Sequence, residues 1–111
     1  MIDKEFKKAV ETLAWEELQR ASKIHPGFVD THQGYAVIKE EIEECEEALN
    51  KVKTHMDGLW NNVKIDDLEG FGFESKVIKT YAIELALEAI QVAAVAEKLM
   101  DILNVNQKII K

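Results

Sequence analysis

Apolar residues recur between residues 31 and 63 at steps of four and three, the spacing of one face of an α-helix. The positions are Ile38, Ile42, Cys45, Leu49, Val52, Met56, Leu59 and Val63. This pattern predicts one long helix that ends near residue 63. Asp30 or Thr31 is placed to cap its N-terminus, and Gln33 is placed to complete a capping box.

A shorter helix is predicted over residues 3–24, with Asp3 as its N-terminal cap. Its apolar arc consists of Phe6, Val10, Leu13, Ala14, Leu18, Ala21 and Ile24. Glu17 lies inside this arc with Arg20 one turn later, and this spacing favours a local salt bridge. Pro26 and Gly27 oppose continuation of the helix, so we expect it to end there.

The third predicted helix covers most of residues 75–103 and is apolar on nearly every side. Between positions 82 and 96 its only polar residues are Glu84, Glu88 and Gln91. Since such a helix is typical of a buried position, we expect the carboxylates of Glu84 and Glu88 to lie inside a bundle. A buried carboxylate must be paired or bound to a metal, because its desolvation costs several kcal/mol.

Two segments flank this helix. Residues 64–74 are rich in Gly and Asp and are predicted to be a connection, with the helix starting at Glu74 or Ser75. The tail from Asn104 is predicted to be a short C-terminal segment, either a frayed turn or an arm that packs on a partner subunit. The sequence therefore predicts an all-α bundle of three long helices plus this segment, completed by oligomerisation.

The length of 111 residues predicts a single domain over residues 1–111. The chain has one Cys, no N-terminal apolar leader and no apolar run long enough for a bilayer, so we expect a cytoplasmic protein without membrane contact. Its net charge of −7 disfavours binding to nucleic acid polymers, whose phosphates it would repel. The three histidines are predicted to be surface or capping residues rather than catalytic ones.

Acidic residues crowd positions 40–47, and their helical angles divide them into two groups. Glu41 projects into the apolar arc and Glu44 lies at its edge one turn later, so their carboxylates can converge. The remaining acids point away from the arc. Antiparallel packing of the second and third helices would add Glu84 and Glu88 to the same place. Such an all-oxygen set suits Mg²⁺ or Mn²⁺, and the chain lacks the paired His ligands expected for Zn²⁺.

Two segments carry a resemblance to a known family: HQGYAVIKEE, residues 32–41, continuing to Glu44, and EAIQVAA, residues 88–94. They resemble the MazG-like all-α nucleotide pyrophosphohydrolases, especially short members from phages and prophages, over roughly residues 15–100. The family motif has two Glu three apart on one helix, then Glu and Asp three apart on a later helix. The resemblance aligns Glu41 and Glu44 with the first pair and Glu88 with the third position.

The resemblance also implies roles for neighbouring residues. Glu40 is the acid adjacent to the first pair and is an expected metal ligand. Gln91 stands where the family has Asp, so it offers an oxygen without a charge, and metal affinity should fall. Glu84, one turn before Glu88, is the candidate substitute. Residues 64–76 are the expected insertion between the two halves of the motif.

The resemblance implies a Mg²⁺-dependent enzyme that cleaves a nucleoside triphosphate into a monophosphate and pyrophosphate. Glu41 and Glu44 are the expected catalytic residues. Lys39 is a candidate contact to the phosphates. Trp15 is a candidate stacking partner for the base, although packing against another helix or protomer is the more common explanation for such a residue. The expected assembly is a homodimer or homotetramer.

Two other hypotheses remain open at this stage. In the first, the bundle keeps the fold, has lost catalysis, and acts as a binding or assembly module, which Gln91 favours. In the second, Glu84 and Glu88 only form ion pairs across a subunit interface, for which Lys64, Lys76 and Lys79 are available.

Overall fold

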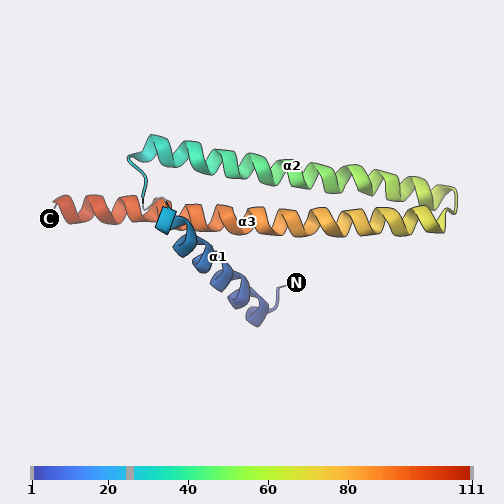
Figure 1. Ribbon diagram of the computed structural model, residues 1–111, viewed down its shortest axis with the longest axis horizontal. Coiled ribbons are helices and arrows are strands. Elements are labelled where there is room, and N and C mark those ends of the chain that lie inside the picture. Colours follow the sequence, from blue (N-terminus) through green and yellow to red (C-terminus); the bar gives the residue numbers. More distant parts are fainter. Residues whose placement is uncertain (1, 25–26, 111) are drawn as a thin grey trace. The chain divides into compact units, whose positions relative to one another are not determined.

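The computed structural model describes the backbone of residues 2–24 and 27–110 and the side chains of residues 2–23 and 27–102. Within these ranges the chain forms three helices and no strand: α1 (Lys4–Ile24), α2 (Thr31–Lys64) and α3 (Leu68–Ile110) (Figure 1). The prediction of an all-α fold with three long helices is confirmed. The helix-breaking residues His25 and Pro26 lie outside the described residues.

Both predicted N-terminal caps are present. The Asp3 carboxylate accepts hydrogen bonds from the backbone N–H groups of Glu5 (2.9 Å) and Phe6 (3.0 Å). The Asp30 carboxylate accepts one from the backbone N–H of Gln33 at 2.9 Å, so Asp30 rather than Thr31 is the cap of α2. The side chain of Gln33 in turn accepts a hydrogen bond from the backbone N–H of Val29 (2.6 Å). These bonds satisfy N–H groups that have no partner within the helix.

The turn between α2 and α3 is much shorter than the predicted connection. Asp66 adopts a left-handed conformation, with φ of 54°, and its N–H bonds to the carbonyl of Val63 at 3.3 Å. The N–H of Asp67 bonds to the carbonyl of Asn62 at 3.0 Å, which completes a Schellman motif. Asp67 then caps α3 by accepting from the N–H of Gly70 at 2.9 Å. The prediction of a connection through residue 74 is therefore wrong.

The C-terminal prediction also needs correction. Residues 104–110 continue α3 without a break, so the separate short segment expected there is the last part of a 43-residue helix. Among the described residues, no helix combines the length and the apolar character needed to cross a bilayer.

The chain divides into two compact units. Unit 1 consists of Met1–Ile42 and Ala89–Lys111, and unit 2 consists of Glu43–Glu88. In unit 2 the second part of α2 and the first part of α3 run antiparallel and side by side (Figure 1). In unit 1 the close approach of α2 to α3 depends on Gly34, where a Cβ atom would collide with the side chain of Leu99. The prediction of one domain is not tested by this division and stays a prediction.

The apolar face of α2 is only partly covered by its own chain. Among the described apolar residues, only Ala48 (6% exposed) and Ala94 (4%) are buried. Ile42, Leu49, Met56 and Val63, spaced seven residues apart on α2, are 39–58% exposed. The residues of α2 that face α3 in unit 2 instead include Glu44, Ala48 and His55. The face of α2 that α3 covers is therefore not its most apolar face. As a result, the apolar stripe of Ile42, Leu49, Met56 and Val63 remains exposed.

Candidate metal centre

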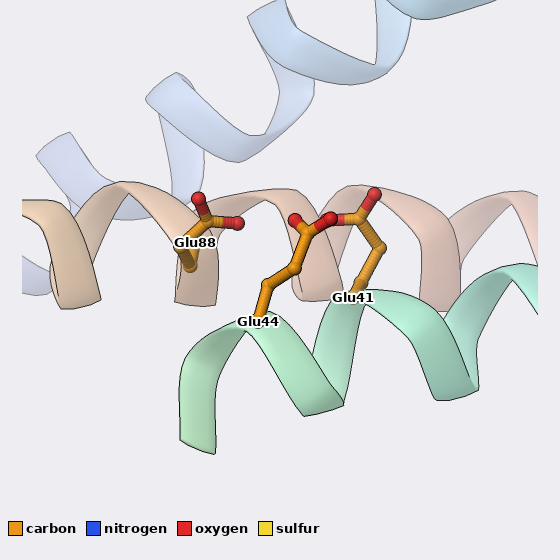
Figure 2. A group of neighbouring side chains, drawn as sticks. All are labelled: Glu41, Glu44 and Glu88. Atoms are coloured by element: carbon orange, nitrogen blue, oxygen red, sulfur yellow. The ribbon is translucent and has the colours of Figure 1, made fainter. Parts of the chain in front are cut away.

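Three carboxyl groups converge where α2 and α3 lie side by side. Glu41, Glu44 and Glu88 each offer one oxygen, and these atoms all lie within 4.8 Å of one another (Figure 2). Figure 2 shows Glu41 and Glu44 rising from α2 and Glu88 on α3, with the carboxyl groups directed into the same space. All three side chains are half-buried. The structure thus brings together the three glutamates that match positions of the family motif.

Local helix geometry explains this convergence. Glu41 and Glu44 are three residues apart on one continuous helix, which places them one turn apart on the same face. Glu44 and Glu88 belong to the same compact unit and lie on its two antiparallel helices. Mg²⁺–oxygen distances are about 2.1 Å, so the ligand oxygens of one ion lie at most about 4.2 Å apart. Small rotations of the three flexible side chains would close the observed spacing.

The surroundings of Glu88 disfavour the charged form of its carboxyl group. Its pKa is raised above the ordinary value, first because burial removes water from the carboxyl group. A hydrogen bond shared with Glu44, and the negative charge of Glu44, raise the pKa further. The charges of Glu84 and Glu47 add smaller effects. A carboxyl group in such surroundings gains stability by keeping a proton or by accepting a cation, since either removes negative charge.

The other predicted ligands lie around this cluster. Glu40 and Glu84 are exposed, so the expectation that Glu84 is held inside the bundle is wrong for the single chain. Glu84 acts on the cluster through its charge, which raises the pKa of Glu88. Gln91 is half-buried and lines a cavity that also includes Glu41. Nothing in this arrangement tests whether Glu40, Glu84 or Gln91 binds a metal.

The two predicted substrate contacts, Lys39 and Trp15, are exposed, and neither lines the cavity of unit 1. Their proposed roles are not tested. The predicted salt bridge on α1 is confirmed: Arg20 donates from Nε (3.0 Å) and Nη2 (2.5 Å) to the two oxygens of Glu17. This bidentate contact keeps the pKa of Glu17 below its ordinary value.

Unit 1 contains a cavity of about 500 Å³ bounded by all three helices. Its walls combine apolar side chains with charged and amide groups: Glu17, Leu18, Arg20, Ala21, Phe28, Gln33, Val37, Glu41, Gln91, Ala94, Val95 and Lys98, together with Gly27. Lys98 is only 8% exposed, and its ammonium group lies 4.8 Å from the centre of the Phe28 ring. Sequence reasoning did not single out Lys98, because it lies near the end of a long apolar stretch.

A second polar cluster lies between the two helices of unit 2. His55 Nδ1 and Glu74 Oε2 are 2.6 Å apart, and the two side chains are 29% and 19% exposed. The His55 ring stacks on Tyr81 with ring centres 5.6 Å apart, and the ammonium group of Lys51 lies 5.2 Å from the centre of Tyr81. Gly58 makes room for this arrangement, because a Cβ there would meet the Glu74 carboxyl group at 2.8 Å. The expectation that His55 is a surface residue is wrong.

Comparison with known proteins leaves the family open. No protein-family model, curated protein or solved structure matches this chain. The resemblance to MazG-like enzymes therefore depends on the motif residues alone.

Proposed function

We propose that this protein is a Mg²⁺- or Mn²⁺-dependent hydrolase that converts a nucleoside triphosphate into a monophosphate and pyrophosphate, as MazG-like enzymes do. The observation that carries the proposal is the convergence of Glu41, Glu44 and Glu88 within 4.8 Å. Three carboxylates at one point, without a cation, repel one another, and the pKa of Glu88 is raised first by burial and then by its hydrogen bond to Glu44 and by the neighbouring negative charges. Their all-oxygen donor set fits Mg²⁺ or Mn²⁺.

The three glutamates have distinct tasks in this proposal. Glu41 and Glu44 would hold the cation from α2, and Glu88 would hold it from α3. A bound divalent ion would neutralise phosphate charge and lower the pKa of a coordinated water. A carboxylate oxygen of the cluster not engaged by the ion would accept the proton of the attacking water. Glu84 remains exposed on the same helix and supplies negative charge that favours cation binding.

The second candidate function is a bundle that keeps this fold without catalysis and acts as a binding or assembly module. The observation that favours it is Gln91 at the position where the family motif has Asp. Its amide carries no charge, so a site that uses it binds a divalent ion less tightly than the family site does. Metal binding without nucleotide turnover is the outcome this candidate predicts.

We further propose that the chain works as a homo-oligomer, either a dimer or a tetramer. The support is the exposed apolar stripe on α2, formed by Ile42, Leu49, Met56 and Val63. On α3, Ile83 and Leu87 are also exposed, at 53% and 57%. Contiguous apolar surface of this kind is typical of an interaction site. The seven-residue spacing on α2 is the spacing at which one helix packs along another.

The direct test is the release of pyrophosphate by the full chain from a panel of nucleoside triphosphates, with Mg²⁺ and with a chelator. We expect Mg²⁺-dependent release from at least one nucleotide, and a loss of at least about 100-fold in Glu44→Gln, because the variant lacks a charged metal ligand.

The matched control is Glu43→Gln, which removes an exposed acid from the adjacent position on the same helix. We expect its activity to equal that of the wild type. If no canonical or modified nucleotide is cleaved, while Mn²⁺ still binds to the cluster, the silent bundle replaces the hydrolase. If Glu43→Gln and Glu44→Gln are equally impaired, the loss comes from the charge of α2 as a whole.

A further inference from the structure

The apolar stripe of α2 is exposed along its whole length. Ile42, Leu49, Met56 and Val63 are exposed, and so is Tyr35, one seven-residue interval earlier on the same continuous helix. Residues at this spacing form a nearly straight row along a helix. At about 1.5 Å per residue, the row is about 42 Å long. A long, narrow apolar row fits the side of another helix better than it fits a small molecule.

Polar and aromatic side chains border this stripe along one edge. Each follows a residue of the stripe by four positions, which is about one helical turn, and each is exposed: Lys39, Glu46, Lys53 and Trp60. The charges of the first three alternate in sign along the edge. An edge with alternating charges can pair with a copy of itself, whereas an edge of one sign would repel its copy.

The direction of two paired copies decides whether these edges meet. In an antiparallel pair, a two-fold axis perpendicular to both helices places the bordered edge of one α2 against the same edge of the other. In a parallel pair, the two edges lie on opposite sides of the contact, and their charges do not meet. The alternating charges therefore favour the antiparallel direction.

The same charges favour one register of the antiparallel pair. When Leu49 lies opposite Leu49 of the second copy, Ile42 lies opposite Met56. Glu46 then comes level, to within about 1.5 Å along the axis, with Lys53 of the second copy, and symmetry makes this contact twice. A register with Ile42 opposite Leu49 would instead bring Glu46 against its own copy. A register with Leu49 opposite Met56 would bring Lys53 against its own copy, and like charges repel.

We infer that the apolar stripe of α2 docks a second copy of this chain, antiparallel and centred on Leu49, with Glu46 of each copy paired to Lys53 of the other. In this register Lys39 also comes level with Trp60 of the second copy, whose ring can accept a cation on its face. The inference rests on the homo-oligomer proposed above, and it names the surface, the direction and the register of the contact. It does not depend on nucleotide hydrolysis.

Charge reversal tests the pairing. Sedimentation equilibrium of the full chain at low ionic strength measures the dissociation constant of the oligomer. Glu46→Lys brings two lysines together at two places in the contact, and we expect it to weaken association by at least about 10-fold. Lys53→Glu should weaken association in the same way. The double variant Glu46→Lys/Lys53→Glu exchanges the two signs and should return the constant to within about 3-fold of the wild type.

Glu43→Lys is the matched control. It makes the same change of charge as Glu46→Lys at an exposed position of α2 away from the bordered edge, and it should associate as the wild type does. Circular dichroism confirms that each variant is folded.

Cysteine cross-linking tests the register. Leu49→Cys, in a Cys45→Ser background, places one thiol of each copy at the two-fold axis, so oxidation should join the two copies at this position. Ile42→Cys in the same background should not cross-link to itself, because Ile42 lies opposite Met56 in the inferred register.

Each other outcome overturns the inference. A wild-type chain that stays monomeric would remove both the contact and the proposed homo-oligomer. An oligomer that Glu46→Lys and Lys53→Glu leave intact, or that the double variant does not restore, would show that the copies associate through another surface. Self-cross-linking of Ile42→Cys, or none of Leu49→Cys, would exclude the register. Failure of the proposed hydrolase looks different: the copies would associate as inferred, but no nucleotide would release pyrophosphate.

Discussion

Two polar clusters lie between α2 and α3 and differ in the residues that form them. At one end, the carboxyl groups of Glu44 and Glu88 lie together, and the charges of Glu44, Glu84 and Glu47 help to raise the pKa of Glu88 above its ordinary value after the effect of burial. Further along, His55 pairs with Glu74, stacks on Tyr81 and has Lys51 nearby. Both clusters are partly buried, and the second combines a carboxyl group with an imidazole, an aromatic ring and a nearby ammonium group.

This difference suggests a structural role for the His55 cluster and a binding role for the acidic cluster. The His55 cluster provides a donor, an acceptor and a stacking surface from its own residues, so it needs nothing from solution. The acidic cluster gathers three carboxyl groups at one place, and binding a proton or a metal ion would reduce their mutual repulsion. We infer that the His55 cluster holds the two helices together and that the acidic cluster binds a cation.

The largest expected effect comes from replacing one acid of the cluster with a positive charge. Glu88→Lys would place an ammonium group beside Glu44 and remove the need for a metal. We expect hydrolysis to fall by at least about 100-fold while the melting temperature stays equal or rises, because repulsion is replaced by attraction. Rates of pyrophosphate release and thermal unfolding measure the two effects.

The corresponding control is His55→Gln, which alters the His55 cluster. Its activity should stay within about 3-fold of the wild type below the melting temperature, since His55 is not at the metal. A 100-fold loss of activity in His55→Gln would contradict the division of tasks between the two clusters.

Substitutions in the His55 cluster are expected to have a smaller effect, on stability rather than on activity. His55→Gln and Glu74→Gln should each lower the free energy of unfolding by about 1 kcal/mol, because each removes one partner of a half-buried hydrogen bond. The double variant should lose less than the sum of the two, which denaturant titration can measure. His32→Gln, on the exposed part of α2, should change stability little. Strict additivity of the two losses would show that the pair is not coupled.

The smallest expected effect is the pH dependence of the acidic cluster without metal. Because the pKa of Glu88 is raised in the folded chain, the folded state holds more protons than the unfolded state between the ordinary and the raised pKa. Stability therefore falls as the pH rises through that interval. Glu88→Gln should be more stable than the wild type near pH 7 by about 1–3 °C, and this advantage should vanish below the ordinary pKa range of glutamate.

Thermal unfolding in the presence of a chelator measures this difference at several pH values. Glu43→Gln should show no such pH-dependent difference, since its side chain is exposed and the charges that raise the pKa of Glu88 do not include it. A Glu88→Gln variant that is less stable than the wild type near pH 7 would mean that the charged carboxylate is stabilised by its surroundings.

The sequence predicted those features that depend on local rules. Asp3 and Asp30 cap helices as expected, because a carboxylate beside free N–H groups requires no tertiary contact. Glu41 and Glu44 meet because residues three apart on a helix are neighbours. Their convergence with Glu88 followed from the family motif, which places the acids on two helices that face each other.

The sequence misled where local signals were ambiguous. Gly70 and Gly72 suggested a loop, but the turn is made by Asp66 in a conformation that usually belongs to glycine. His55 and Glu74 are 19 residues apart, so their contact depends on the register of α2 against α3. That register buries His55 and leaves Leu49 and Met56 exposed, which the apolar periodicity alone could not indicate.

The central claim is that the acidic cluster binds a divalent cation. Calorimetric titration of the full chain with Mn²⁺ tests it most directly, because binding is measured without any assumption about the substrate. We predict saturable heat at about one ion per chain, an affinity at least about 10-fold weaker in Glu44→Gln, and an unchanged affinity in His55→Gln. A wild-type chain that gives no saturable heat, or a Glu44→Gln variant that binds Mn²⁺ like the wild type, would contradict the claim.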